Sequence, residues 1–128
     1  MKIIAQKLPK KSHELDCGLD CFTIESFDIS PLETKTIGLG FSVEIPEGYA
    51  GMLIPRSSIA KRGLICQTSI IDPGYTGEVH LIITNCSNNT YHFNENDRIV
   101  SLVLYNILNP ILNPLNDRGS NGLGSTNK

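Results

Sequence analysis

Residues 70–78 read Ile70-Ile71-Asp72-Pro73-Gly74-Tyr75-Thr76-Gly77-Glu78, and the rest of the chain is organised around this stretch. Pro73 fixes the backbone at the first corner of a turn, and Gly74 accepts the positive φ that other residues resist. The apolar pair before the turn and the apolar run after it predict a β-hairpin. We expect Asp72 and Tyr75 to project from the two shoulders of this hairpin. A surface acid and a surface tyrosine are the ordinary outcome of such a turn, so a functional role depends on the rest of the chain.

The chain has 128 residues and a formal net charge of -2. This length predicts one domain with a core large enough to need no disulfides. The slight negative charge argues against nucleic acid or an anionic membrane as a partner. The first seven residues are too short for a signal peptide or a membrane span, so we expect a cytoplasmic protein, or one in the host cytoplasm if the source is viral.

Short apolar runs separated by turn residues fill most of the chain. The expected strands cover residues 22–24, 36–39, 41–45, 50–54, 79–83 and 98–105. This spacing predicts an all-β barrel or sandwich. Only residues 57–62 predict a helix, with hydroxyl groups capping its start and Gly63 capping its end. Residues 116–128 are rich in Gly, Ser and Asn, which predicts a flexible arm after a folded domain of residues 1–115.

Four cysteines and three histidines offer no obvious catalytic or metal-binding spacing. We expect the cysteines, Cys17, Cys21, Cys66 and Cys86, to be free thiols that serve as small hydrophobic residues. The histidines, His13, His80 and His92, fit no catalytic triad, and we expect them to be structural or exposed.

Three further segments carry groups suited to phosphate or metal chemistry. Arg56, Ser57 and Ser58 precede the short helix, where free N–H groups, hydroxyls and a guanidinium form a phosphate site. Asp20 is a turn carboxylate before an apolar run, and residues 97–98 indicate a solvated strand end. Residues 118–126 combine glycines, hydroxyls and an arginine able to wrap a phosphate chain. Each segment alone has an ordinary alternative: a helix cap, a surface acid or a disordered terminus.

Taken together and in this order, these segments resemble the five motifs of the homotrimeric deoxyuridine triphosphatases (dUTPases). The matching segments are residues 17–21, 55–58, 71–78, 97–102 and 118–126. The resemblance implies a jelly-roll-like β-barrel with one short helix, and a homotrimer whose active sites are shared between subunits. It also implies hydrolysis of dUTP to dUMP and pyrophosphate with Mg²⁺ as cofactor. Such chemistry depends on positioning and charge neutralisation more than on a protein nucleophile.

The resemblance also implies roles for individual residues. Asp72 would activate the water that attacks the α-phosphorus, Tyr75 would pack under the deoxyribose, and Asp20 would order water on the Mg²⁺. The backbone of Ile70, Ile71 and Asp72 and that near His80 would pair with the base, and Arg56, Ser57 and Ser58 would bind the phosphates. The role of Gln67 is open. The arm of a neighbouring chain would contribute Arg118, Leu123, Gly124, Ser125 and Thr126.

Two departures and two alternatives accompany this hypothesis. Ser101 stands where the family usually has Gln, and Leu123 stands where an aromatic ring usually covers the uracil. The related dCTP deaminases carry a catalytic Glu at the place of Ile82, which argues against deamination. A dUTPase-like barrel that regulates another protein is the second alternative, and the sequence does not exclude it.

Overall fold

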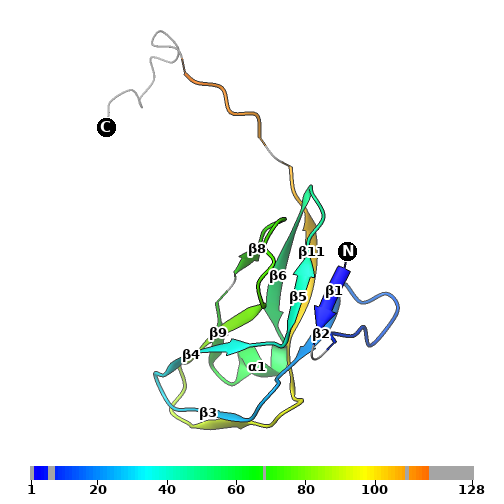
Figure 1. Cartoon of the computed structure of the whole chain (residues 1–128). Helices are drawn as coiled ribbons and strands as arrows, with labels where there is room; N and C mark the ends of the chain where they lie inside the picture. The colour runs from blue at the N-terminus through cyan, green and yellow to red at the C-terminus, as the bar shows by residue number, and fades with distance from the viewer. Residues whose placement is uncertain (1, 6–7, 68, 109, 116–128) are drawn as a thin grey trace.

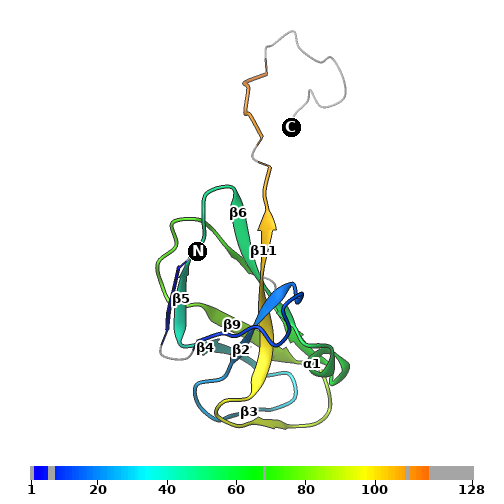
Figure 2. The same ribbon diagram turned by 90° about the vertical axis from the view of Figure 1, so that its right-hand side faces the viewer.

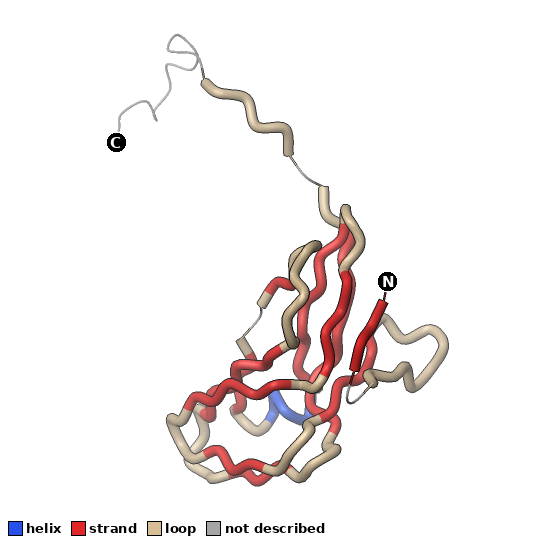
Figure 3. Tube along the Cα trace, viewed as in Figure 1, coloured by secondary structure: helices blue, strands red, loops and turns tan. Residues whose placement is uncertain are grey.

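The regular structure of the chain is almost entirely antiparallel β-strand in the computed structural model, which describes residues 2–5, 8–67, 69–108 and 110–115 (Figure 1). The described elements are β1 Lys2–Ala5, β2 Gly18–Phe22, β3 Phe27–Ile29, β4 Thr34–Gly38, β5 Phe41–Glu44, β6 Tyr49–Pro55, α1 Ser57–Lys61, β7 Leu64–Cys66, β8 Ile70–Ile71, β9 His80–Asn85, β10 Tyr91–Phe93 and β11 Arg98–Asn106. Strands are the main regular structure of the body, loops connect them, and the described helix occupies a single place (Figure 3). The predicted all-β class with one short helix is therefore confirmed.

The strands form four antiparallel sheets. One has the order β2-β11-β6-β8, another the order β4-β9-β7, and two are the pairs β1-β5 and β3-β10. These sheets are not closed into one continuous barrel, so the jelly-roll-like arrangement is open. Beyond β11 the described chain runs away from the body in both views (Figures 1 and 2).

Period-two alternation builds the core. In β9, for example, Leu81 and Ile83 are fully buried, while Ile82 between them is half-buried. Leu53 and Leu102, from β6 and β11, meet the same core. Burying a side chain of this size stabilises a fold by about 1.5–3 kcal/mol, so these strands form a firm frame for the loops between them.

The hairpin predicted for residues 70–78 is not formed. β8 pairs with β6, with Ile71 opposite Gly51, whereas β9 pairs with β4 and β7. The segment is thus a loop that crosses from one sheet to another. Local turn chemistry did select the turn, because Gly74 has φ +94°. It did not select the partner strand, which the other sheets supply.

Three local predictions also differ from the structure. The strand expected at residues 22–24 ends at Phe22. Arg56, with extended backbone, is the N-cap of α1 and makes no side-chain cap bond, so the predicted hydroxyl cap is wrong. Gly63 does follow the helix with φ +81°, as predicted. The cysteines are free, but only two of them are buried: Cys21 and Cys66 are in the core, and Cys17 and Cys86 are exposed.

None of the helices in the described ranges is long and apolar enough to cross a bilayer.

His92 joins the two-stranded sheet of β3 and β10. Its Nδ1 lies 2.5 Å from Asp28 Oδ1, and its Nε2 lies 2.9 Å from Asn94 Oδ1. A ring with an oxygen acceptor on each nitrogen is best satisfied when both nitrogens carry protons. The hydrogen bond to Asp28, then that to Asn94, raises the pKa of His92 above its ordinary value of 6.5.

We expect this contact to make stability depend on pH. Because the folded-state pKa is raised, the contribution is fully present below the unfolded-state pKa and is lost as pH rises through the folded-state pKa. His92→Gln should therefore lower the melting temperature at pH 5.5 more than at pH 8.5. Melting curves of both proteins across this range test the expectation, and an equal loss at both pH values would contradict it.

Candidate active site

The loop of residues 72–79 (the Asp72 loop) is held in shape by its own atoms. The Tyr75 N–H donates to the Asp72 carbonyl (3.2 Å), and the Tyr75 hydroxyl donates to the Glu78 carbonyl (2.8 Å). The Tyr75 ring lies over Gly77, where an added Cβ would come within 2.6 Å of the hydroxyl oxygen. Gly77 is therefore required for room. Both Asp72 and Tyr75 are exposed on this loop.

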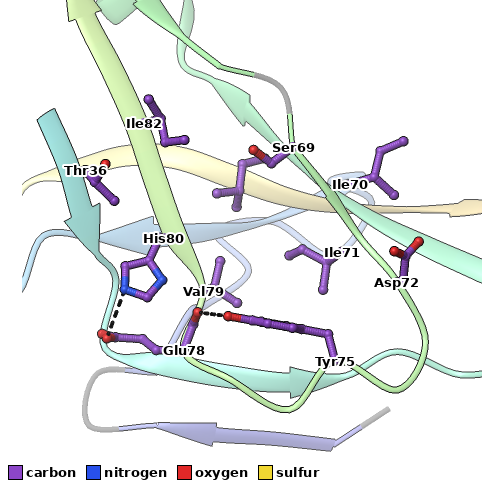
Figure 4. Close-up of a pocket in the computed structure, with 11 residues that line it drawn as sticks. Thr36, Ser69, Ile70, Ile71, Asp72, Tyr75, Glu78, Val79, His80 and Ile82 are labelled. Atoms are coloured by element: carbon purple, nitrogen blue, oxygen red, sulfur yellow. Dashed lines mark hydrogen bonds and ion pairs between the residues drawn. The ribbon is translucent and has the colours of Figure 1, made fainter. Parts of the chain in front are cut away.

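A cavity of about 400 Å³ opens beside this loop (Figure 4). Its walls come from β4, β6, β8, β9 and the loop itself, and the lining residues are Thr36, Leu53, Ser69, Ile70, Ile71, Asp72, Tyr75, Glu78, Val79, His80 and Ile82. The predicted site residues Ile70, Ile71, Asp72, Tyr75 and His80 are thus brought together at one hollow. Its apolar floor and few polar groups suit a small, flat ligand such as a nucleobase with its sugar.

A second group of predicted residues gathers where β6 meets α1. Arg56 donates from Nη1 to the Arg98 carbonyl (3.3 Å), which fixes its side chain against the start of β11. Ser57 is exposed. The Ser58 Oγ atom is buried, with no hydrogen-bond partner among the described residues. An unpaired buried hydroxyl is costly, so this position suits an added polar ligand or chain.

Asp20 lies next to this group and is more enclosed than the sequence suggested, with 14% of its side chain exposed. Its Oδ2 accepts hydrogen bonds from Ser12 Oγ (2.5 Å) and Arg98 Nη1 (3.1 Å), and its Oδ1 accepts a long one from Ser101 Oγ (3.4 Å). Burial by itself would raise the pKa of Asp20, but the Ser12 hydrogen bond and the Arg98 hydrogen bond and charge outweigh it. The pKa therefore lies below its ordinary value, and the carboxylate stays ionised at neutral pH.

The two groups of residues do not meet within one chain. Ile71 lies opposite Gly51 of β6, whereas Arg56 follows the other end of that strand. Five residues of strand span roughly 17 Å, and Asp72 lies on the far side of Ile71 from Arg56. Figure 1 shows β8 and α1 at different levels along β6. Asp72 and Arg56 of one chain are therefore too far apart to contact the same phosphate group.

Some predicted residues fall elsewhere. Gln67 is exposed and donates its backbone N–H to the Ile82 carbonyl (2.8 Å), and it does not line the cavity. Arg118, Leu123, Gly124, Ser125 and Thr126 lie outside the described residues.

The sequence reasoning missed three polar residues at these sites. Ser12 has no sequence signal, because a loop alone brings it to Asp20. Arg98 was interpreted as a solvated strand end and is in fact ion-paired with Asp20. Glu78, inside the third motif, was given no role. Arg98 and Glu78 both lie within the motif segments, so their place in a motif was the signal that could have identified them.

Comparison with known proteins gives the family. The family model described as dUTPase matches residues 5–127 of the chain. The chain belongs to the dUTPase family. A deoxyuridine 5'-triphosphate nucleotidohydrolase of Leifsonia xyli is 33% identical, over 97% of this chain and 88% of that protein. One of Clostridium novyi is 30% identical, over 98% of this chain and 99% of that protein.

Solved dUTPase structures have the same fold. The dUTPase of Staphylococcus bacteriophage 80alpha with dUPNHPP superimposes with a TM-score of 0.82 at 26% identity, over 98% of this chain and 97% of that chain. A mutant dUTPase of S. aureus phage phi11, described as coordinating a structural Mg(II) ion, gives 0.83 at 27% identity, over 89% of this chain and 95% of that chain. The jelly-roll-like fold expected from the resemblance is confirmed.

Gly77→Ala tests the packing of Tyr75 in this dUTPase. The new Cβ would overlap the ring and break the hydroxyl bond to Glu78, so we expect stability to fall by about 1 kcal/mol or more. Tyr75→Phe, which removes only the hydroxyl, should cost less. Urea unfolding of the three proteins measures this order, and an unperturbed Gly77→Ala variant would contradict the packing.

Proposed function

We propose that this dUTPase hydrolyses dUTP to dUMP and pyrophosphate, with the nucleoside in the cavity beside the Asp72 loop. The observation that carries the proposal is the placement of Asp72 and Tyr75 together on the rim of a mainly apolar cavity. The relatives named as dUTP nucleotidohydrolases and the phage enzymes solved with dUTP analogues support it.

In this proposal the cavity binds the base and sugar. The backbone of Ile70, Ile71 and Asp72 and that near His80 pairs with the uracil, and Tyr75 packs under the deoxyribose. The ring of Tyr75 is fixed at its hydroxyl by the Glu78 carbonyl, and in this proposal it excludes a 2′-hydroxyl. A rigid ring that rejects one extra oxygen separates deoxyribose from ribose.

Asp72 is the proposed general base. Its carboxylate is exposed on the loop and can accept a proton from a water aimed at the α-phosphorus. The pyrophosphate leaves in line with that attack and is held by Arg56, Ser57 and Ser58. The unpaired Ser58 hydroxyl gives one of these contacts a donor without another partner in the described chain.

The residues present fit a magnesium ion held mainly by the substrate. The described residues contain no cluster of three or more His, Cys, Asp or Glu side chains that could hold a metal alone. Asp20 is ionised, and its Oδ1 has only the long Ser101 contact, so it can accept a hydrogen bond from metal-bound water. Bound to the triphosphate oxygens, Mg²⁺ would neutralise the charge that develops on the leaving group.

Neither alternative function gains support. Ile82 lines the cavity with an apolar side chain, and such a group cannot transfer the protons that deamination requires. Phage dUTPases of similar fold are described as controlling transfer of virulence genes, but no feature of the described chain favours a regulatory surface of that kind.

A substrate panel tests the reaction. We expect dUTP to be hydrolysed with Mg²⁺ and not with chelator, and dCTP and UTP to be poor substrates. Asp72→Asn should lower kcat by about a thousandfold, the usual contribution of a general base, while Glu25→Gln, an exposed carboxyl far from the cavity, should change nothing. Release of uracil nucleotide from dCTP, or an unaffected Asp72→Asn variant, would overturn the proposal.

We further propose a homotrimer with shared sites. The outer face of the β2-β11-β6-β8 sheet carries a row in which Val103, Met52 and Ile70 stand opposite one another, beside Ile54. Ile70 is 62% exposed. An apolar face of this kind suits a protein partner. Asp20 pairs with Ser101, which pairs with Ile54, so a second copy packed on this face reaches the phosphate residues.

The arm completes this scheme. Residues 107–108 and 110–115 are described without regular structure, and they carry the exposed apolar side chains Ile107, Leu108, Ile111, Leu112 and Leu115. These give the segment apolar surface to lay against another subunit. The following residues 116–128 would then close over a neighbour's nucleotide, with Arg118 on the γ-phosphate, Ser125 and Thr126 on phosphate oxygens, and Leu123 against the base.

Mixing two inactive variants tests site sharing. Arg56→Gln and Asp72→Asn chains should each be inactive alone. Suppose that Arg56 and Asp72 of one site come from different chains. After random co-assembly of equal amounts, each of these two residues is wild-type in about half of the sites, so both are wild-type in about one quarter, and about one quarter of wild-type activity should return. A site built within one chain would restore none. Refolding equal amounts together and assaying dUTP turnover decides between the two.

A further inference from the structure

Glu78 sits at the end of the Asp72 loop in a slot made by two glycines. Its Oε2 accepts the N–H of Gly40 at 2.8 Å. A Cβ on Gly38 would lie 2.7 Å from Glu78 Oε2 and 2.9 Å from Oε1, so the carboxylate occupies the space where a side chain would stand. A hydrogen bond to an ionised carboxylate is stronger than one between neutral groups. The Glu78 side chain is thus tied to the corner between β4 and β5.

The backbone next to Glu78 is fixed to the same corner. Val79 donates its N–H to the Phe41 carbonyl (2.8 Å) and accepts the N–H of Leu39 (3.0 Å). The Glu78 carbonyl accepts the Tyr75 hydroxyl. Glu78 therefore connects the Tyr75 ring to the corner between β4 and β5, and this connection fixes the position of the ring.

The other end of the Asp72 loop, next to β8, is held by fewer interactions. β8 has two residues, which pair with Gly51 and Met52 of β6. Between β8 and Glu78, residues 72–77 are stabilised by the two bonds of Tyr75 already described. Figure 4 shows Glu78 with its carboxylate turned to His80 and its backbone to Tyr75. The His80 Nε2 lies 3.5 Å from Glu78 Oε1, so the same carboxylate also adjoins the wall formed by His80.

We propose that Glu78 is a positioning residue for the nucleotide site: anchored by the Gly40 N–H in the slot at Gly38, it holds Tyr75, and with it the Asp72 loop, in register with the cavity. This rests on the proposed dUTP hydrolysis. Its role is to position groups that contact the substrate, because the polar atoms of Glu78 already interact with Gly40, His80 and Tyr75. Displacing a reacting group by about 1 Å can cost a hundredfold in rate.

Three variants test the role. Glu78→Ala removes the carboxylate. Gly38→Ala keeps Glu78 but displaces its carboxylate from the slot, because the new Cβ overlaps the end of this flexible side chain. Both should raise KM for dUTP by about tenfold, the loss expected when a charged hydrogen bond disappears. Glu78→Gln keeps an oxygen acceptor for Gly40 and should restore most of this loss. Glu44→Ala, an exposed glutamate on β5, is the matched control.

Amide hydrogen exchange at Gly40 gives a readout apart from turnover. Exchange should be slow in the wild type and Glu78→Gln, and fast in Glu78→Ala and Gly38→Ala. If the two disruptive variants melt at a lower temperature but keep the wild-type KM while folded, Glu78 is only structural and the inference fails. If the wild type does not hydrolyse dUTP, the proposed function itself fails, and the Gly40 exchange rates still report whether the anchor exists.

Discussion

The pairing of β6 with β11 is the contact on which the rest of the structure depends. It runs from Pro55 opposite Val100 to Tyr49 opposite Asn106. At one end it brings Arg56 to the Arg98 carbonyl, and the other edge of β6 receives β8. Because β8 pairs with one end of β6 and Arg56 follows the other end, the length of β6 fixes the separation of the two halves of the site. The proposed sharing of sites between chains follows from this geometry.

Several glycines of the described chain supply room for a neighbouring group, and others supply unusual backbone angles. A Cβ on Gly18 would lie 2.9 Å from Ser101 Cβ, so only glycine lets β2 approach β11 closely enough to place Asp20 beside Ser101. Gly77 makes the same allowance for the Tyr75 ring, and Gly38 makes it for the Glu78 carboxylate. At Gly18 and Gly38 the space is filled by a side chain from a distant part of the chain, and at Gly77 by the ring of the same loop.

Electrostatics separate the two carboxylates of the proposed site by environment. Asp20 is enclosed and tied to Arg98 and Ser12, which lower its pKa and fix its direction. Asp72 is exposed on a loop with no charged partner among the described side chains at hydrogen-bond distance. A carboxylate held still suits the ordering of water around a cation, whereas a free one suits proton transfer from an attacking water.

The sequence by itself determined the features that depend on neighbouring residues. The turn at Gly74 was predicted because a positive φ there is a local requirement, and the β-class was predicted because short apolar runs alternate with turn residues along the chain. The motif order also identified the dUTPase family, since it preserves chemistry along the chain. The sequence also singled out Asp72, Tyr75 and His80, which line one cavity in the structure.

Tertiary structure alone decided which strands pair and which side chains meet. The predicted hairpin failed because β8 gains its hydrogen bonds from β6, a choice made by the sheets and not by the turn. The contact of Ser12 with Asp20 and the slot for Glu78 at Gly38 join residues with no regular spacing in the sequence. Such contacts depend on the exclusion of volume and the pairing of buried polar groups in three dimensions, and no local pattern encodes either.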